Sequence, residues 1–382
     1  MTLPDFAPFE LEEWQSRWEH GVRYNLADSG VRAPTLRDLQ ALGADLAPLL
    51  DRSLHYPEVQ GTGALRERIA SLHPGATPDG VLVTVGAAEA GMVAVEALTR
   101  PGDDVCVLTP SYPQVEGLLR NRGCRVRTLR LDPGRDWALD EASHTRAILP
   151  TTKVVAICNP NNPTGRVLRP SELESIRERT RSVGATLLVD EVYRGTEHDG
   201  VERPTLFDPD QKTVVLGSLS KAYGMPGLRL GWTVSSPEIT QALWRRHEYA
   251  AISAAGPSMA VAEQVLASPL RERLLARTRG LIEQGLGTLR TWLDDDGSAL
   301  RWTPPEAAAF AFLRLPEGTD GDRWASELRD QQGVLVAPGS AFGHPDYVRL
   351  TYALDPDRLA GALGRITTHL ASSSHAGTQR HR

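Results

Sequence analysis

Short apolar runs alternate with amphipathic stretches between about residues 80 and 236 of the chain. Several of the intervening stretches have helical spacing, as in AAEAGMVAVEALTR and RPSELESIRERTRSVG. Continuous apolar strands joined by helices are typical of a mainly parallel sheet covered on both faces, so we predict an α/β fold. The runs are VLVTVG (81–86), VCVLTP (105–110), VVAICNP (154–160), TLLVDEVY (186–193), TVVLGSLS (213–220) and LRLGWTVS (228–235).

A second unit follows the last of these runs. A long helical stretch after Pro257 leads into a segment with the apolar runs AAFAFLRL, VLVAPG and YVRLTYAL. A chain of 382 residues also exceeds the length at which one core usually stops growing. We therefore predict a large domain over residues 36–270 and a small α+β domain over residues 271–370, to which an N-terminal arm (residues 1–35) belongs. The polar, aperiodic tail (residues 371–382) is predicted to be disordered.

Composition and charge argue against several classes of protein. The net charge of −6, from 42 basic and 48 acidic residues, disfavours a nucleic-acid-binding protein. No apolar run approaches the roughly 20 residues that cross a bilayer, and the N-terminus lacks the apolar core of a signal peptide, so we predict a cytoplasmic protein without membrane association. The three cysteines have no paired spacing with each other or with histidine, so we expect neither disulfides nor a metal site.

Two ionisable residues at strand ends are candidates for catalysis. Lys221 follows the run TVVLGSLS and precedes the Gly/Pro-rich stretch AYGMPGLRLGW, which is unusual for a surface lysine. Such a lysine can form a Schiff base with an aldehyde. Asp190 closes TLLVD, where it either caps a turn or keeps a ring nitrogen protonated. Ser218 and Lys221 also spell the S-x-x-K signature of serine acyl-enzymes, but the accompanying S-D-N and K-T-G triads are absent.

Three further residues could surround an aromatic ring. Asn162 lies in NPNNPTG, and Tyr193 lies three residues after Asp190. Both could donate to a phenolic oxygen and so lower the pKa of a neighbouring Schiff base. Tyr112, in PSYPQ, could stack on the ring itself. The simpler interpretations are a proline-rich turn for Asn162 and a half-buried aromatic side chain for Tyr193.

A glycine-containing turn between a strand and a helix is a candidate anion site. Gly86, Ala87 and Ala88 join VLVTV to a helix, whose first backbone N–H groups can converge on an anion. Further candidate ligands at neighbouring strand ends are Ser218, Ser220 and Arg229. A G-x-G at residues 61–63 lacks a preceding apolar strand, so we reject a dinucleotide site. A lysine, a ring-facing carboxylate, an anion cradle and a stacking wall are together what pyridoxal 5′-phosphate requires, and we predict this cofactor.

Arg349 lies inside the strand-like run YVRLTYAL, where an unpaired arginine is unusual. A bidentate clamp on the α-carboxylate of a substrate would explain it. The alternative is a buried ion pair with a local acid.

The motifs YPEVQGTGALRERIA, GAAEA, NPNNPTG, DEVYRG, SLSKAYGMPGLRLGW and VRLTY together resemble class I/II aminotransferases of fold type I, over roughly residues 55–355. The resemblance implies a mainly parallel, seven-stranded sheet in the large domain and an amino-acid substrate. It implies that Lys221 forms the Schiff base and later moves a proton, and that Asp190 pairs with the ring nitrogen. Asn162 and Tyr193 would bind the phenolic oxygen, with Asn162 also near the substrate, whose carboxylate Arg349 would bind. Tyr112 would stack on the ring, and the phosphate would be held by Gly86, Ala87, Ala88, Ser218, Ser220 and Arg229.

Two features of the resemblance concern regions outside this set. Tyr56 resembles the tyrosine that reaches the phosphate of the neighbouring subunit, which implies a homodimer with shared sites. The N-terminal stretch EEWQSRWEHGVRYNLADSGVRAPTLRDL resembles capreomycidine synthase and related arginine-modifying enzymes of antibiotic pathways. This similarity implies that the arm lies over the substrate and that Gly30 and Val31 form its active-site turn. Asp28 is then a candidate partner for a cationic substrate side chain, or else a simple turn or helix-cap acid.

The predicted site allows more than one reaction. With the α-carboxylate clamped, the Cα–H bond breaks, and Lys221 can serve as acid or base in transamination, elimination, replacement or cyclisation. Because of the unusual arm, we favour elimination, replacement or cyclisation of an L-amino acid such as a hydroxylated arginine, in secondary metabolism. Ordinary transamination with a 2-oxo acid is the alternative. A non-enzymatic regulator built on this fold would carry a DNA-binding domain, for which we find no segment of sufficient size.

Overall fold

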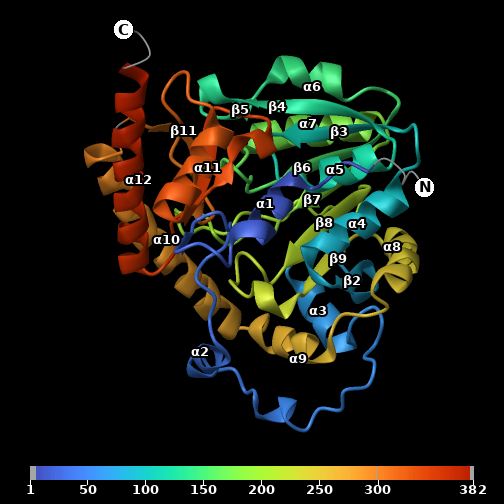
Figure 1. Ribbon diagram of the computed structural model, residues 1–382. Coiled ribbons are helices and arrows are strands. Elements are labelled where there is room, and N and C mark those ends of the chain that lie inside the picture. The colour runs from blue at the N-terminus through green and yellow to red at the C-terminus, as the bar shows by residue number, and fades with distance from the viewer. Residues whose placement is uncertain (1–5, 298, 379–382) are drawn as a thin grey trace, which may run out of the picture.

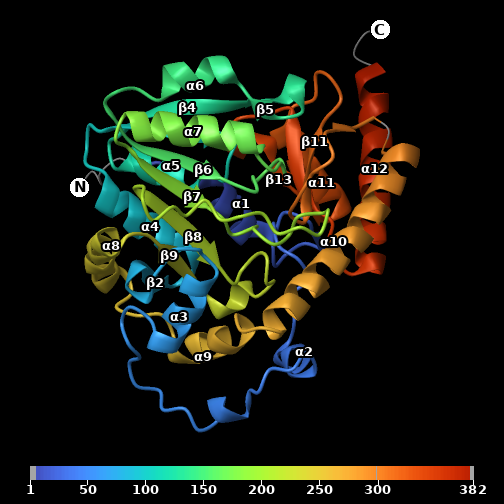
Figure 2. The ribbon, with the colours of Figure 1, turned by 180° about the vertical axis from the view of Figure 1, so that it is seen from behind.

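A mixed eight-stranded sheet forms the centre of the larger core (Figures 1 and 2). The computed structural model describes residues 6–297 and 299–378. Two strands, β5 and β9, run antiparallel to the other six. In spatial order the strands are β2 (Val81–Thr84), β9 (Gly231–Val234), β8 (Thr213–Ser218), β7 (Thr186–Asp190), β6 (Thr152–Cys158), β3 (Asp104–Thr109), β4 (Arg125–Asp132) and β5 (Ala138–Leu139). The six apolar runs all form strands of this sheet, which confirms the predicted α/β fold.

The two strands at one edge of the sheet, β4 and β5, lie outside those runs. β4 alternates polar and apolar residues, and Arg125, Arg127 and Arg130 are exposed on it. This alternation arises because one face of a strand near the sheet edge meets solvent, so it lacks the continuous apolar signal of the central strands. β4 therefore completes the predicted seven strands, and the two-residue β5 adds a short eighth.

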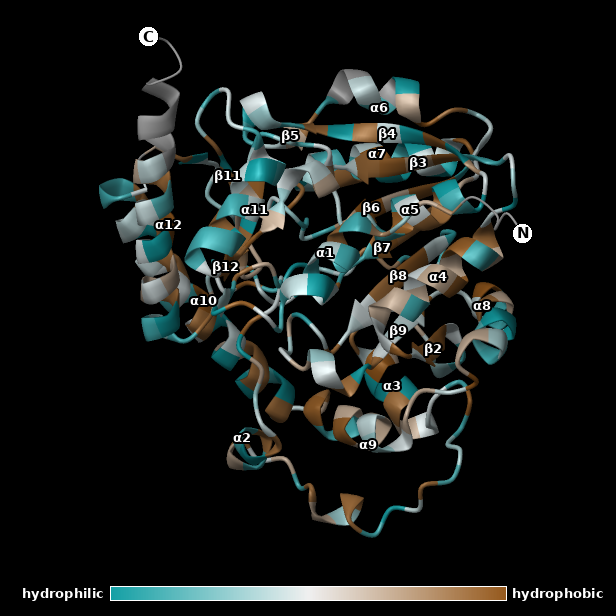
Figure 3. Ribbon diagram, viewed as in Figure 1, coloured by the Kyte–Doolittle hydropathy of each residue, from teal (hydrophilic) through white to brown (hydrophobic). Residues whose placement is uncertain are grey.

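Helices cover both faces of the sheet, because successive residues of each strand point to opposite sides. Val105 and Val107 belong to one core, and Cys106 and Leu108 belong to the other. Hydrophobic residues accordingly fill the central strands in Figure 3, while hydrophilic residues lie along the outer helices. The sheet face with Val105 and Val107 is covered by α4 (Gly86–Leu98), α5 (Gln114–Asn121) and α8 (Pro237–Ala250). The opposite face, with Cys106 and Leu108, is covered by α3 (Gly63–Ser71), α7 (Pro170–Ser182) and α9 (Gly256–Val265), and α6 (Glu141–Ala147) lies against β4.

A second core lies around a four-stranded antiparallel sheet, with the order β10 (Arg301–Trp302), β11 (Phe310–Arg314), β14 (Tyr347–Thr351) and β13 (Ala337–Pro338). It packs against α11 (Gly321–Gln332), α12 (Pro356–Thr378) and α10 (Leu270–Asp295). The long helix α10 contributes Leu274 to the first core cluster and Leu286 to the second, so one rigid element joins the two. The boundary at residues 270/271 stays a prediction, and α10 begins beside it.

The N-terminal segment packs against this second core. Trp14 of α1 (Glu10–Trp18) donates from Nε1 to the carbonyl of Val336 at 2.9 Å, and the Arg329 guanidinium lies 3.9 Å from the ring centre of Trp18. Farther along, β1 (Tyr24–Asn25) pairs in parallel with β12 (Val334–Leu335), and the short helix α2 (Leu36–Ala41) follows. Residues 1–5 of the arm lie outside the described residues.

The tail differs from its prediction. Residues 371–378, expected to be disordered, continue helix α12 as far as Thr378, and residues 379–382 lie outside the described part of the chain. Extending an existing helix costs little, because each added residue gains a backbone hydrogen bond without a new nucleus. The tail therefore needs no apolar periodicity of its own. Among the described residues, no helix combines the length and the apolar character required to cross a membrane.

Candidate active site

The predicted site residues gather beyond the carboxyl ends of the central parallel strands, where open α/β sheets bind ligands. Asp190 is the last residue of β7 and Ser218 the last residue of β8. Tyr112 and Asn162 lie in the loops that follow β3 and β6. Arg349 comes from β14 of the second core, so both cores contribute to one site.

Lys221 and Asp28 face each other in this site. The Lys221 Nζ atom lies 3.4 Å from Asp28 Oδ1, and the two side chains are 24% and 54% exposed. Asp28 Oδ1 also accepts from the backbone N–H groups of Ser29 at 2.5 Å and Gly30 at 3.2 Å. The nearby Lys221 ammonium is the main cause that holds the pKa of Asp28 below its ordinary value. Asp28 thus both closes a turn and presents a carboxylate to the candidate catalytic lysine.

The turn that follows Asp28 is closely packed. The Gly30 carbonyl accepts from Thr351 Oγ1 at 3.2 Å, and a Cβ atom on Gly30 would lie 3.9 Å from the Ser220 carbonyl oxygen. Val31 is 7% exposed and packs against Gly224, just beyond Lys221. The segment from Asp28 to Val31 therefore borders the loop that carries the lysine.

Asn162 connects two other site residues. Its Nδ2 donates to Tyr193 Oη at 3.1 Å, and its Oδ1 accepts from Arg349 Nη1 at 2.7 Å. Tyr193 is buried and packs edge-on against Phe310, with 5.3 Å between ring centres. Burial raises the pKa of Tyr193, so its hydroxyl keeps its proton and can donate it to an oxygen anion.

Arg349 is 1% exposed yet has no ion pair with an acid among the described residues, so the alternative of a buried salt bridge is not found there. Its second fork nitrogen, Nη2, donates to the carbonyl of Ala27 at 2.6 Å, and its Nε has no hydrogen-bond partner. The guanidinium lies between Phe310 and Phe342, at 5.4 Å and 5.1 Å from the ring centres. A buried, unpartnered N–H between two aromatic rings is suited to donate a hydrogen bond to a carboxylate.

Asp190 carries an unusual carboxyl group. Burial raises its pKa to about 6, although it accepts from the backbone N–H of Val192 at 3.0 Å and the Lys221 ammonium acts in the opposite direction. A carboxylate in this position gains a favourable partner when a protonated ring nitrogen faces it. The site is therefore incomplete without a cationic heterocycle, which fits the predicted cofactor.

Replacing Asp190 with asparagine should stabilise the cofactor-free protein at pH 8 by up to about 3 kcal/mol, at about 1.4 kcal/mol per pKa unit. The folded-state pKa is raised from 3.8 to about 6, so the buried charge destabilises the wild type increasingly as the pH rises through this range. Urea unfolding of both proteins at pH 5 and pH 8 measures the difference. An advantage of Asp190→Asn that is equal at both pH values would contradict this account.

The turn before α4 matches a phosphate cradle. Gly86 has φ +77°, and a Cβ atom there would lie 2.6 Å from Arg229 Nη2, so only glycine allows the guanidinium to approach. Ala87 and Ala88 follow in the first turn of α4, where backbone N–H groups are free. Ser218 and Ser220 are buried and linked by a hydrogen bond from the Ser220 N–H to Ser218 Oγ at 3.1 Å. The backbone N–H groups, the two serine hydroxyls and the positive charge of Arg229 together suit a phosphate dianion.

Tyr112 lies under the arm. Its hydroxyl donates to Glu12 Oε1 at 2.7 Å, and its ring lies 5.4 Å from that of Phe9. Glu12 was not among the predicted site residues, because the acidic first turn of α1 gives no sign that one of its carboxylates would point to a residue 100 positions away. Tyr56, in contrast, is 75% exposed and does not contact the site of its own chain. Its predicted role, to reach the phosphate of a neighbouring subunit, requires such an exposed position.

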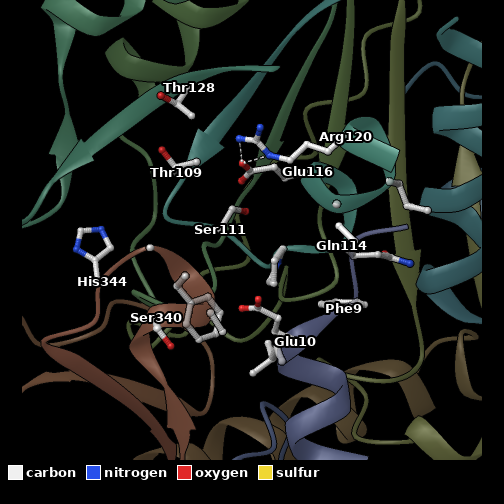
Figure 4. Close-up of a pocket in the computed structure, with 18 of the residues that line it drawn as sticks. Phe9, Glu10, Thr109, Ser111, Gln114, Glu116, Arg120, Thr128, Ser340 and His344 are labelled. Carbon is white, nitrogen blue, oxygen red and sulfur yellow. Dashed lines mark hydrogen bonds and ion pairs between the residues drawn. The ribbon is translucent and has the colours of Figure 1, made fainter. Parts of the chain in front are cut away.

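A cavity of about 1060 Å³ borders this site (Figure 4). Phe9 and Glu10 line it from the start of α1, Thr109 and Ser111 from the end of β3, and His344 from the loop that precedes β14. Its lining contains the neighbours of Tyr112 on both sides and also Phe342, the ring against which Arg349 lies. The cavity therefore adjoins the wall of the candidate site without containing any of the predicted catalytic side chains.

The fold and the site together define a pyridoxal-phosphate-dependent enzyme with the aminotransferase fold. The sequence model of the family "aminotransferase class I and II" matches residues 47–366, and the chain belongs to this family.

Two curated relatives illustrate the range of reactions in the family. Capreomycidine synthase from Streptomyces vinaceus is 30% identical over 95% of this chain and 93% of its own. The arginine–pyruvate transaminase AruH from Pseudomonas aeruginosa is 29% identical over 85% of this chain and 84% of its own.

Solved structures give the same picture. A PLP-dependent aminotransferase from Streptococcus suis has a TM-score of 0.90 and 29% identity over 96% of this chain and 98% of its own. The PLP-dependent cyclase OrfR has a TM-score of 0.90 and 27% identity over 98% of this chain and 99% of its own. The predicted fold type and cofactor are confirmed. The similar proteins include both aminotransferases and a cyclase, so they cover more than one reaction.

Proposed function

We propose that the protein eliminates, replaces or cyclises at the side chain of a basic L-amino acid, such as a hydroxylated arginine, in secondary metabolism. The observation that carries the proposal is the Asp28 carboxylate, which faces Lys221 at 3.4 Å. A second carboxylate, Glu12, bonds to Tyr112 on the same side of the site. Two arm carboxylates, one beside Lys221 and one on Tyr112, favour a cationic substrate side chain. The similarity to capreomycidine synthase and to the cyclase OrfR supports the same class of reaction.

In this proposal each residue has a definite task. Arg349 binds the α-carboxylate through its unpartnered Nε and a fork nitrogen, and Asn162 holds the arginine in place. Lys221 holds the cofactor and then takes the proton from Cα, while Asp28 turns to the cationic end of the substrate. When bound, the cofactor withdraws electrons from Cα, and Asp190 sustains this by pairing with its ring nitrogen. The contacts of Asn162 and Tyr193 suit donation to its phenolic oxygen, Tyr112 suits stacking on its ring, and the turn at Gly86 with Arg229 suits its phosphate.

Transamination is the second candidate. It is favoured by the resemblance to the arginine–pyruvate transaminase and to the aminotransferase from Streptococcus suis. The same lysine, clamp and ring contacts would serve it, because the two reactions diverge only after the Cα proton has been removed.

We further propose a homodimer with shared sites, in which Tyr56 reaches the partner's phosphate. Large apolar side chains are exposed at Leu50, Leu54 and Tyr56, at 89%, 85% and 75%, and Tyr249 is 97% exposed. Leu50, Leu54 and Tyr56 lie close together in the chain, and large apolar side chains exposed in one segment favour an interaction site there. A cytoplasmic location stays a prediction.

The experiment that separates the two reactions uses the holoenzyme and a panel of L-amino acids that includes hydroxylated arginines. Each reaction is followed by the absorption spectrum of the cofactor and by mass spectrometry of the products, with and without pyruvate. Loss of water or ring closure without a 2-oxo acid supports the proposal. A stoichiometric conversion of the cofactor to its amine form, with release of a 2-oxo acid, would show transamination instead.

Replacing Asp28 with asparagine should lower kcat/KM for basic amino acids by about 30- to 200-fold, and for neutral ones by less than about threefold, because a charge-assisted hydrogen bond that the bound substrate shields from water contributes about 2–3 kcal/mol. Glu13→Gln, which removes an exposed acid of the same arm, is the matched control and should change neither value. An equal decrease for basic and neutral substrates would assign Asp28 to the positioning of Lys221 rather than to substrate choice.

A further inference from the structure

A buried acid–base pair lies behind the turn at Gly86. His247 of α8 is 0% exposed and Glu89 of α4 is 8% exposed. The His247 Nδ1 atom lies 2.8 Å from Glu89 Oε1, and its Nε2 lies 3.2 Å from the carbonyl oxygen of Val59. Neither residue contacts the substrate side of the site. Charged groups are rarely buried so completely unless they are paired, so the pair calls for a physical explanation.

The hydrogen-bond pattern determines the charge of this pair. A backbone carbonyl only accepts, so Nε2 of His247 must carry a proton. The contact between Nδ1 and Glu89 Oε1 then also contains one proton. The other oxygen of Glu89 accepts from the backbone N–H of Val85 at 2.5 Å, which favours the carboxylate form. With one proton on Nε2 and one in the contact with Glu89, the pair as a whole carries no net charge, so His247 cancels the charge of the Glu89 carboxylate.

The position of Glu89 explains why the cancellation matters. Val85 is the N-cap residue of α4 and directly precedes Gly86, so the Glu89 carboxylate lies at the helix N-terminus. This is the end of the helix that attracts anions, and it is also the end that adjoins the Gly86–Arg229 contact. A carboxylate and a phosphate dianion at one helix terminus repel each other, and more strongly where water is excluded.

We propose that His247 is a positioning residue that neutralises Glu89, and so allows the turn at residues 85–88 to accept the phosphate dianion of the cofactor. The pair also fixes the distance between this turn and Val59, because His247 bonds to both segments. The proposal rests on the assignment of this turn to phosphate, and not on which reaction the enzyme performs.

The test measures cofactor binding rather than turnover. Apoenzyme is titrated with pyridoxal 5′-phosphate and, separately, with pyridoxal, which keeps the aldehyde but lacks the phosphate. The proteins are the wild type, His247→Gln, Glu89→Gln and the double variant. His247→Gln should weaken pyridoxal 5′-phosphate at least about tenfold and pyridoxal less than about threefold, because the exposed negative charge acts on the phosphate. The double variant should restore the affinity for pyridoxal 5′-phosphate to within about threefold of the wild type, since it removes both charges.

A purely structural role predicts a different pattern. His247→Gln would then weaken both ligands equally, and the second substitution would not restore binding; either result overturns the proposal. If His247→Gln fails to fold, Glu89→Gln alone decides. It should keep or increase the preference for the phosphorylated ligand, and a selective loss of that preference would overturn the proposal. Because the readout is cofactor affinity, a transaminase and a cyclase give the same expected result. Failure of this proposal is therefore distinguishable from failure of the proposed reaction.

Discussion

Replacing Lys221 with alanine should leave a folded protein that no longer holds its cofactor covalently and that turns over more than about 10⁴-fold more slowly. Lys221 is expected both to bind the aldehyde and to move the Cα proton, so both functions disappear with one side chain. Its loop is anchored independently by backbone bonds, from Ala222 N to the Val192 carbonyl at 3.2 Å and from Gly224 N to the Lys221 carbonyl at 3.1 Å. The fold should therefore survive the substitution.

Borohydride reduction followed by peptide mass spectrometry measures this directly. The only other lysines of the sequence are Lys153 and Lys212, so the labelled peptide identifies the attachment site without ambiguity. Lys212→Ala is the control, because Lys212 is exposed and its Nζ donates to the carbonyl of Gly184 at 3.4 Å, away from the candidate site. Label on either of the other lysines in the wild type would refute the assignment.

Replacing Arg349 with lysine should lower kcat/KM by about 10²- to 10³-fold while the cofactor stays bound. Lysine keeps the charge but cannot donate to Asn162, to the Ala27 carbonyl and to a carboxylate in one plane. Steady-state kinetics with an amino acid and with its amide measures the contribution of the carboxylate. The penalty should largely vanish for the amide, which offers no charge to clamp.

Arg314 provides the matched control for this experiment. It lies on the neighbouring strand β11, is exposed, and pairs with Asp346 at 3.1 Å. Arg314→Lys should change kcat/KM by less than about twofold, because an exposed pair contributes little. If Arg349→Lys impaired the amino acid and its amide equally, the arginine would support the fold of the site rather than bind the substrate.

The sequence predicts the parts of this molecule whose signal is local. Lys221, Asp190 and Asn162 each lie at or just beyond the end of a largely apolar strand, and the carboxyl ends of parallel strands meet at one edge, so their proximity could be inferred. β4 escaped this logic because its arginines face solvent and interrupt the apolar signal.

Contacts between distant segments could not be inferred in this way. Glu12 reaches Tyr112 across 100 positions, and Glu89 reaches His247 across 158. No periodicity connects such residues, since their meeting depends on how whole helices pack. The Ala27 carbonyl that accepts from Arg349 is also invisible to sequence reasoning, because any residue type carries the same group. Asp28 illustrates an intermediate case: the turn that the sequence offered as its simpler role is present, whereas its position facing Lys221 was not predicted and its contact with a substrate stays a prediction.

The attachment of the arm has a consequence for how such an enzyme can diversify. Groups suited to hold the cofactor come from strand ends of the large sheet, whereas Asp28 comes from the N-terminal arm, which the buried side chains of Leu26 and Val31 anchor in the second core. Asp28 lies between these two anchors and is 54% exposed, so its side chain can change without loss of the packing that holds the arm. Exposed positions of the arm can therefore accumulate changes, while its buried anchors and the machinery beneath them are inherited unchanged.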